Sequence, residues 1–260
     1  MSEPLILPKK SSHHANSTLL VVIATLNEFD NLPILVPSVF ELFPGSKVLV
    51  IDDDSTDGTG EWCDAFKERD PRLEVLHRVG ERGLGSATLA GFRWGLENQF
   101  DLIATMDADL SHDPKSLKAM LELLENDQAN RLGLVIGSRY VEGGGIRGWP
   151  WYRHLASRMA NTYVRCILRL KTRDNTSGFR LYRSRALRRI DLSDVASTGY
   201  AYLEEILWRL QRVQVESAEI PIVFVDRVQG QSKVRLGVVL NSLFQILKMS
   251  IKNFMNQGKG

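Results

Sequence analysis

The chain has 260 residues, of which 43% are apolar and 25% are charged, and its formal net charge is +2. These values are typical of a globular protein and exclude wholesale disorder, while the length suits one large domain. No apolar stretch reaches the roughly 18 residues of a membrane-spanning helix, and Cys63 and Cys166 lie too far apart for a zinc site.

The N-terminal segment contains prolines, adjacent lysines and two histidines, but no apolar core of a secretory signal. We therefore expect residues 1–17 to form a flexible tail. One folded domain at 18–235 and a C-terminal amphipathic helix at 236–260 are expected to follow it.

Between residues 19 and 136, short runs rich in Val, Ile and Leu alternate with amphipathic segments. The runs predict buried strands at 19–24, 47–51, 73–76, 102–106 and 134–136. The amphipathic segments predict helices at about 31–42, 59–69, 86–98 and 114–125, the last with Asp113 as its N-cap. This alternation predicts an α/β fold with a mostly parallel, Rossmann-like sheet flanked by helices.

Polar clusters follow four of the predicted strands. They are Asn27-Glu28, Asp52-Asp53-Asp54-Ser55, Asp107-Ala108-Asp109 and Gly137-Ser138-Arg139. Each cluster by itself suits the start of a helix. Because the carboxyl ends of parallel strands share one edge of a sheet, four such clusters predict a single binding site there.

The cluster with the clearest chemistry places Asp107 and Asp109 on either side of one small residue. Mg²⁺ and Mn²⁺ prefer oxygen ligands, and Mg²⁺ typically takes one or two protein carboxylates together with water and substrate phosphates. A solvated turn or a helix cap is the other interpretation of this pattern. Its place among the four clusters favours a metal site for a phosphate-bearing ligand.

The sequence changes character after Tyr140. Residues 142–151, EGGGIRGWPW, combine glycines with two tryptophans, which predicts a loop without regular structure. We interpret about 140–152 as a lid. A helix is expected from about 152 to 170, and because Arg153, Ser157 and Asn161 recur every four residues, they share one face of it.

An arginine and a hydroxyl on one helical face suit a phosphate clamp, although a solvated polar stripe has the same pattern. The surrounding residues 131–190 include fourteen basic and two acidic residues, a net charge of +12. This surface suits anionic lipid head groups or phosphorylated substrates. We expect no nucleic-acid partner, since the chain has no zinc finger, RNA-binding motif or continuous basic helix.

The last predicted element, at about 235–253, has helical apolar spacing with lysines toward its end. Such a helix packs on the sheet or lies in a membrane surface.

Several segments resemble motifs of the inverting family 2 glycosyltransferases with the GT-A fold, and among them those of the polyprenol (dolichol) phosphate mannosyltransferases. The resemblance extends over about residues 19–236. The segments are VIDDDSTDGT at 50–59, GLGSA at 83–87 with Gly91, DADLSHDP at 107–114, GSRY at 137–140, DNTSGFR at 174–180 and VDRVQGQSK at 225–233. The last two are the most specific for the polyprenyl-phosphate branch.

The resemblance implies inverting transfer of mannose from GDP-mannose to a polyprenyl (dolichyl) monophosphate, with Mg²⁺ or Mn²⁺ as cofactor. In this reading Asp107 and Asp109 hold the metal. The donor-binding residues that it implies are Ala24, Leu26, Glu28, Ile51, Asp53, Asp107, Ala108, Asp109, Arg139, Arg227 and Lys233.

The acceptor phosphate is expected at Arg139, Arg153 and Ser157. A phosphate monoester has a second pKa near about 6, so at neutral pH it is mostly dianionic and can attack without a general base. Asp174 completes the expected catalytic set of Asp107, Asp109, Arg139 and Asp174, either as a base or, as we expect, by orienting the arginines.

The chain departs from the family at Ala24 and Leu26, where the family usually has proline and tyrosine. Because this changes the wall of the base pocket, a polyprenyl-phosphate hexosyltransferase that uses UDP-glucose or another nucleotide sugar is the alternative. A non-catalytic nucleotide-sugar-binding subunit is a more remote one. We expect a peripheral protein at the cytoplasmic face of a membrane, reached through the basic surface, the last helix or a membrane-anchoring subunit.

Overall fold

The computed structural model describes residues 17–80, 82–195, 197, 199–226 and 242–250. Most of the predicted tail, Arg227, Lys233 and much of the predicted C-terminal helix lie outside these ranges. None of the helices within the ranges combines the length and the apolarity that crossing a bilayer requires.

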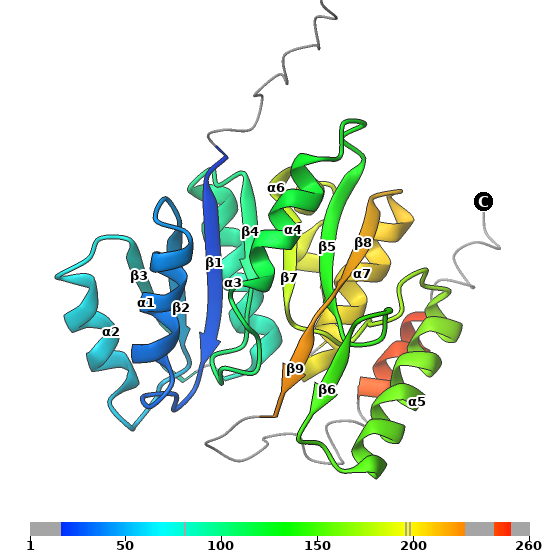
Figure 1. Cartoon of the computed structure of the whole chain (residues 1–260), viewed down its shortest axis with the longest axis horizontal. Helices are drawn as coiled ribbons and strands as arrows, with labels where there is room; N and C mark the ends of the chain where they lie inside the picture. Colours follow the sequence, from blue (N-terminus) through cyan, green and yellow to red (C-terminus); the bar gives the residue numbers. More distant parts are fainter. Residues whose placement is uncertain (1–16, 81, 196, 198, 227–241, 251–260) are drawn as a thin grey trace, which may run out of the picture.

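A sheet of seven strands forms the centre of the molecule (Figure 1). In spatial order its strands are β3 (Leu73–His77), β2 (Lys47–Asp52), β1 (Leu19–Thr25), β4 (Leu102–Thr105), β7 (Arg180–Arg183), β5 (Leu132–Ser138) and β8 (Glu216–Pro221). β7 is antiparallel to β4 and β5, whereas the other neighbouring strands are parallel. The prediction of a mostly parallel α/β sheet is confirmed, and β7 and β8 are additions to the five predicted strands.

Helices cover both faces of the sheet. The α-helices are α1 (Leu32–Leu42), α2 (Thr59–Lys67), α3 (Leu84–Glu97), α4 (Ser116–Glu125), α5 (Trp151–Leu168), α6 (Ser184–Leu187) and α7 (Tyr202–Arg212), and two short 3-10 turns are η1 (Leu192–Asp194) and η2 (Gly199–Ala201). Buried residues of α1, α2 and α4 belong to one core cluster. Those of α3, α5, α6 and α7 belong to the other.

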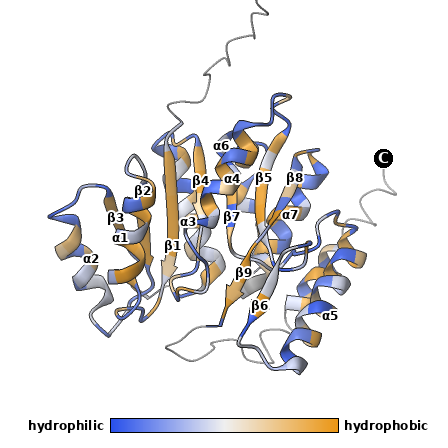
Figure 2. Ribbon diagram, in the orientation of Figure 1, coloured by the Kyte–Doolittle hydropathy of each residue, from blue (hydrophilic) through white to orange (hydrophobic). Residues whose placement is uncertain are grey.

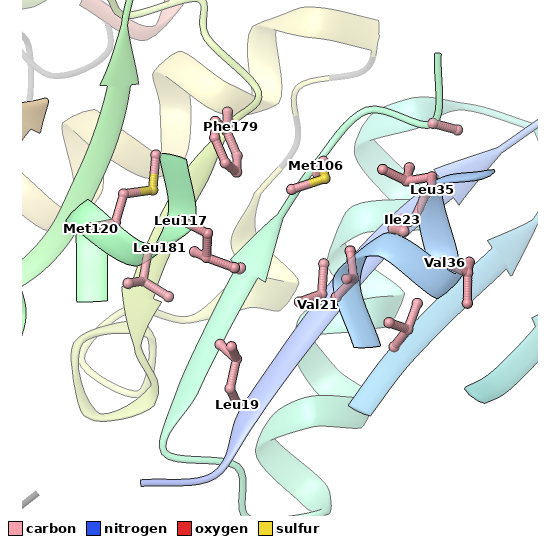
Figure 3. Close-up of a cluster of buried hydrophobic side chains, with 14 of the residues drawn as sticks. Leu19, Val21, Ile23, Leu35, Val36, Met106, Leu117, Met120, Phe179 and Leu181 are labelled. Carbon is pink, nitrogen blue, oxygen red and sulfur yellow. The ribbon is translucent and has the colours of Figure 1, made fainter. Parts of the chain in front are cut away.

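The alternation of β1 explains this two-sided core. Leu19, Val21 and Ile23 enter the cluster that contains α1 and α4 (Figure 3), whereas Leu20 and Val22 enter the opposite cluster. Because successive side chains of a strand point to opposite faces, a strand covered on both sides is apolar at every position. The strands are accordingly the most hydrophobic part of the ribbon (Figure 2).

Two glycines let α3 lie close to the sheet. A Cβ atom at Gly91 would lie 2.4 Å from Cγ1 of Val22, and one at Gly95 would lie 2.7 Å from Cδ1 of Ile103. No larger residue fits at either position unless the strand side chains move. The second half of α3 therefore lies directly against β1 and β4.

The structure corrects two local predictions. Residues 145–147, expected to lack regular structure, form β6 (Gly145–Arg147), which pairs in parallel with β9 (Val223–Val225). The glycines of this segment predicted a loop. The pairing depends on β9, which lies far along the chain, so the local sequence did not indicate it. In addition, α4 begins at Ser116, and Asp113 accepts a hydrogen bond from the Lys115 amide at 3.0 Å without being the N-cap.

The described part of the predicted C-terminal helix, residues 242–250, is helical and packs on α5. The Tyr163 hydroxyl donates to the Leu243 carbonyl at 3.2 Å, and the Ser250 hydroxyl donates to the Ile167 carbonyl at 3.2 Å. Ile246 is buried in the core cluster of α3 and α7. Packing, one of the two arrangements expected for this helix, is therefore observed.

Candidate active site

The four polar clusters lie at one edge of the sheet, where β1, β2, β4 and β5 end. β5 runs in the same direction as β4 because β7 is antiparallel to both. This edge is the lower one in Figure 1, where the β1 arrow ends.

The loops after β1 and β2 are joined to each other. The Asn27 amide donates to Oγ of Ser55 at 2.8 Å, and Oδ1 of Asn27 accepts from the Thr56 amide at 2.9 Å. The Glu28 amide donates to Oγ1 of Thr59 at 3.0 Å. These bonds fix the shape of the predicted donor edge, with Asn27 at a left-handed φ of 56°.

Asp53 connects this edge to α3. Its buried carboxylate accepts from the Gly83 amide at 2.8 Å through Oδ2, and Oδ1 lies 3.4 Å from Nε of the buried Arg78. Nη2 of Arg78 in turn donates to Oγ of Ser86 at 2.7 Å. The carboxylate predicted to contact the nucleotide is thus held by the first turn of a helix.

The other predicted donor residues line the same edge at different depths. Ala24, Leu26 and Glu28 are half-buried, and Glu28 accepts from Nδ2 of Asn31 at 2.8 Å. Ile51, the strand neighbour of Ala24, is fully buried, so its side chain supports the edge from within the core.

Asp107 and Asp109 differ in exposure. The Asp107 side chain is 41% exposed, whereas Asp109 is buried and its Oδ1 accepts from Oγ of Ser111 at 2.5 Å. Ala108 between them is buried in the core cluster of α1 and α4. The pair therefore presents one solvent-facing carboxylate and one that the adjacent turn holds in place.

Gly178 makes room for Asp107. A Cβ atom at residue 178 would lie 3.0 Å from Oδ1 of Asp107, and the Gly178 carbonyl accepts from Oγ1 of Thr105 at 2.7 Å. A side chain at residue 178 would therefore press on the carboxylate.

His112 lies among these groups, although the sequence analysis gave it no role. Its ring stacks on Phe179 with centroids 5.1 Å apart, and its Nδ1 accepts from the Asp107 amide at 3.3 Å. Burial lowers the pKa of His112 despite the opposing charges of Asp107 and Asp109, so the ring is neutral at neutral pH. The sequence did not indicate this burial, because a buried and an exposed histidine after an acidic pair have the same sequence pattern.

The chemistry of this cluster fits a divalent cation. In the described ranges, no three His, Cys, Asp or Glu side chains are arranged as a closed metal centre. Two carboxylates at an open edge suit an ion such as Mg²⁺, which completes its shell with water and ligand phosphates.

Arg139 and Asp174 form a buried ion pair. Nε and Nη2 of Arg139 donate to Oδ2 and Oδ1 of Asp174, each at 2.7 Å, and the Arg139 amide donates to Oδ2 at 2.9 Å. Nη2 also donates to Oγ1 of Thr176 at 2.7 Å. Burial by itself would raise the pKa of Asp174, but the charge and hydrogen bonds of Arg139 lower it below its usual range.

Aromatic rings surround the same guanidinium. The Cζ atom of Arg139 lies 5.4 Å from the ring centroid of Tyr140, 5.7 Å from that of Phe224 and 5.9 Å from that of Trp149. Such contacts hold an arginine without neutralising it.

Arg153 is held by a second set of contacts. Its Nη1 lies 3.0 Å from Oδ2 and 3.1 Å from Oδ1 of Asp226, and its Cζ lies 4.0 Å from the ring centroid of Trp149. This pair is partly exposed, unlike that of Arg139. Asp226 and Trp149 were not predicted as partners of Arg153, because nothing in their spacing along the chain relates them to it.

The predicted face of α5 does point toward the site. Oγ of Ser157 accepts from the Tyr140 hydroxyl at 2.7 Å. Nδ2 of Asn161 donates to Oγ1 of Thr176 at 3.0 Å, and Oδ1 of Asn161 accepts from the Asn175 amide at 2.7 Å. The helix is thereby joined to the loop that carries Asp174.

The structure thus brings the predicted site residues between Ala24 and Asp174 to one edge of the sheet. The charges of Asp107, Asp109, Arg139 and Asp174 all act on the pKa of His112. The predicted roles of Arg227 and Lys233 fall outside the described residues.

Comparison with known proteins gives a consistent result. Residues 20–191 match the sequence model of glycosyl transferase family 2. The chain is 40% identical over 242 residues to the polyprenol monophosphomannose synthase of Mycolicibacterium smegmatis, covering 93% of this chain and 90% of that protein. It is also 40% identical over 233 residues to the undecaprenyl-phosphate mannosyltransferase of Micrococcus luteus, covering 90% and 94%.

Solved structures show the same fold at low identity. The glucosyl-3-phosphoglycerate synthase of Mycobacterium tuberculosis, in complex with Mn²⁺, UDP-glucose and phosphoglyceric acid, superposes with a TM-score of 0.67 at 18% identity. The match covers 91% of this chain and 80% of that one. The GT-A architecture expected from the motifs is confirmed.

Proposed function

The chain belongs to the family 2 glycosyltransferases, and from this premise we propose that it transfers mannose from GDP-mannose to a polyprenyl monophosphate with inversion at the sugar. The observation that carries the choice of acceptor is the pair of arginines, Arg139 and Arg153, that carboxylates and aromatic rings hold beside the metal-binding edge. The names of both relatives support the same acceptor class.

Asp107 and Asp109 would hold Mg²⁺ or Mn²⁺. When bound, the ion offsets the charge that grows on the departing diphosphate. Ser111 fixes the orientation of Asp109 by its hydrogen bond, and Gly178 leaves the space that Asp107 occupies. Arg227 and Lys233, which lie outside the described residues, are proposed to contact the diphosphate as well.

The nucleoside would lie against the edge formed after β1 and β2. Glu28 and Asp53 supply carboxylates there, and Ala24 and Leu26 supply the apolar wall. The hydrogen bonds between the two loops organise this edge before the ligand arrives, which reduces the cost of binding.

The acceptor phosphate would lie between Arg139, Arg153 and Ser157. At neutral pH it is largely dianionic, so it serves as its own nucleophile, and the protein has to position it and offset its charge. Asp174 orients Arg139: its carboxylate is buried, and its lowered pKa makes it a poor proton acceptor. The segment 140–152 is proposed to act as a lid over this acceptor region.

Direct assay tests the proposal. Purified protein with radiolabelled GDP-mannose, a short polyprenyl phosphate and Mg²⁺ or Mn²⁺ should form a labelled lipid, and chelation of the metal should abolish its formation. If neither ion supports transfer from GDP-mannose, the proposal is wrong. Nucleotide binding without turnover would instead favour a non-catalytic subunit.

The second candidate is the same transfer from UDP-glucose or another nucleotide sugar. The half-buried Leu26 favours it, because an aliphatic side chain in the base wall lacks the ring and hydroxyl that the family usually places there. Thermal-shift titration with GDP and UDP separates the two: greater stabilisation by UDP at equal concentration would support the second candidate.

A further inference from the structure

The basic segment 131–190 is divided between two edges of the sheet. Arg139 and Arg153 lie at the edge of the candidate active site. Residues 180–189, RLYRSRALRR, contain five further arginines and include β7 and α6. Because β7 is antiparallel to β4, it ends at the opposite edge, the upper one in Figure 1. The arginines that follow this end of β7 are therefore not part of the proposed acceptor region.

A cavity of about 680 Å³ lies at this opposite edge, where β1 and β4 begin and β7 ends. Arg183, Arg185 and Arg188 line it, and Asp101 is the one acidic side chain among its described lining residues. These four side chains give the cavity a net charge of about +2 at neutral pH. Its volume is within the range of roughly 300–1,000 Å³ that is usual for small-molecule sites.

Backbone carbonyls hold the three guanidinium groups in place. Arg183 is buried and donates to the carbonyls of Leu124 and Leu132 at 2.7 and 3.1 Å. Arg185 and Arg188 each donate to a backbone carbonyl at 2.6 Å. Such neutral acceptors fix a guanidinium without removing its charge, and they leave most of its five N–H donors for other partners.

The charges of these arginines are not balanced by neighbouring carboxylates. Within the described part of the chain, none of the three forms an ion pair, in contrast to Arg139 and Arg153. Burial lowers the pKa of Arg183, and the charge of Arg185 lowers it further, against an opposing effect of Asp127. The positive charges therefore disfavour one another, and an anion in the cavity would offset this repulsion.

We propose that this cavity is a second anion site, which binds the diphosphate group of a small molecule. Guanidinium groups bind phosphate oxygens through paired N–H donors, and three of them suit a diphosphate better than a single phosphate. Free pyrophosphate and a nucleoside diphosphate share this group. An acidic peptide is the other partner that arginines suit, but the concave shape of the site and the burial of Arg183 favour a small anion.

Titration calorimetry with pyrophosphate tests the site, in a buffer that contains a chelator. The variant Arg185→Gln/Arg188→Gln should bind pyrophosphate about tenfold more weakly, because charge-assisted hydrogen bonds are lost. Both side chains are exposed, so circular dichroism should show an unchanged fold. Arg69→Gln/Lys118→Gln is the matched control: it removes the same charge from exposed positions elsewhere and should bind like the unaltered protein. Equal affinities of the two variants would overturn the proposal.

Asp101 provides a test with the opposite sign. Its Oδ2 accepts from the amide and the hydroxyl of Thr18 at 2.9 and 3.1 Å, and an asparagine oxygen can accept the same bonds. Asp101→Asn should therefore keep the local structure and bind pyrophosphate about threefold more tightly, since a repelling charge is removed. An affinity that stays equal or falls would contradict an anion in this cavity.

Pyrophosphate bound at the candidate active site would give a different pattern. In the presence of the chelator, Arg153→Ala should keep the pyrophosphate affinity of the unaltered protein, because Arg153 is at the other edge of the sheet. If Arg153→Ala weakens binding and Arg185→Gln/Arg188→Gln does not, the anion binds at the active site and the proposal is wrong.

A comparison of probes identifies the source of the diphosphate. The binding that Arg185→Gln/Arg188→Gln loses should be about tenfold tighter for pyrophosphate or GDP than for inorganic phosphate. Tighter binding of pyrophosphate than of GDP would indicate the free anion, and the reverse would indicate a nucleotide. If a hexapeptide of glutamate binds more tightly than both, an acidic protein segment is the partner and the small-anion site is refuted.

This site does not rest on the proposed function. None of its lining residues belongs to the proposed metal, donor or acceptor sets. Without added anion, Arg185→Gln/Arg188→Gln should transfer mannose at the rate of the unaltered protein. If the unaltered protein binds pyrophosphate in the cavity but transfers no mannose, the anion site is supported and the proposed function is contradicted. Transfer without any pyrophosphate binding would overturn the anion site alone.

Discussion

The first half of the site, at the ends of β1, β2 and β4, differs from the second half, around β5 and α5, in how its polar residues are held. In the first half, loops that follow adjacent strands bond to each other, largely through backbone amides, as Asn27 does with Ser55 and Thr56. In the second half, arginines are held by carboxylates 35 and 73 residues away, Arg139 by Asp174 and Arg153 by Asp226. Regular β-α repeats place neighbouring loops together, whereas the second half depends on contacts that form only in the complete fold.

Substitutions in the two halves should also lower stability by different amounts. Removing a neutral hydrogen bond at a loop costs little, because water replaces the partner. Removing one member of a buried ion pair leaves the other as an uncompensated charge in the protein interior. The following variants test this difference, beginning with the largest expected effect.

Asp107→Asn should slow transfer by about 100- to 1,000-fold, because a neutral amide replaces the exposed carboxylate that would hold the ion. Initial rates at saturating metal measure the effect, and circular dichroism should show an unchanged fold. Asp113→Asn, in the same loop and outside the proposed metal site, should keep nearly full activity. A rate for Asp107→Asn within a few-fold of that control would contradict the metal assignment.

Arg139→Ala should lower the free energy of unfolding by about 3–5 kcal/mol, since Asp174 would remain buried without its partner. Ser55→Ala in the first half should cost less, about 2 kcal/mol, because it removes one neutral hydrogen bond, from the Asn27 amide, and one hydrogen bond to the Asp52 carboxylate, which keeps its contacts with Thr25 and the backbone of residue 55. Urea titration of both variants provides the comparison. Equal costs would show that the two halves are not held differently.

Glu204, buried on α7 within range of the charges of Arg180 and Asp174, makes stability depend on pH. Burial raises the pKa of Glu204 from 4.5 to about 7, and its Oε2 has no hydrogen-bond partner within the described part of the chain. The unfolded state therefore loses its proton first, so the contribution of Glu204 to stability is greatest below pH 4.5 and falls until about pH 7. Above pH 7, the buried charge of Glu204 lowers the free energy of unfolding by about 3 kcal/mol.

Glu204→Gln should remove this penalty, so that its free energy of unfolding above pH 7 exceeds that of the unaltered protein. Urea titrations below pH 4.5 and above pH 7 measure the difference. Glu97→Gln, at an exposed position of α3, should leave the pH dependence unchanged. If Glu204→Gln behaves like this control, the buried carboxylate is not the source.

Arg153→Ala should raise the KM for a short polyprenyl phosphate by about tenfold, because one charge-assisted contact to the phosphate is lost. It should leave the KM for the nucleotide sugar unchanged. Stability should fall by no more than about 1 kcal/mol, since the ion pair with Asp226 is partly exposed. Equal losses for both substrates would refute the acceptor assignment and weaken the distinction between the two halves.

Sequence patterns predicted the first half of the fold well because β1, β2 and β4 are apolar at every position between their ends. β7 escaped prediction because arginines occupy both of its ends. Arg180 is fully buried, and its guanidinium donates to the carbonyls of Asn175 and Leu203 at 2.6 and 2.7 Å. A hydropathy pattern predicts that such an arginine is exposed. The carbonyls that accept its hydrogen bonds are brought to it by the fold, and the local pattern does not show them.

The sequence by itself determined the alternation of strands and helices, the position of Asp107 and Asp109 at a strand end, and the face shared by Arg153 and Ser157. These follow from local periodicity and from the directions that a strand or helix imposes on its side chains. Only the tertiary structure decided the partners of Arg139 and Arg153, the burial of His112 and the exposure of large apolar residues of α5 such as Trp151. Burial and charge pairing depend on which distant segments meet, and that is settled when the whole chain packs.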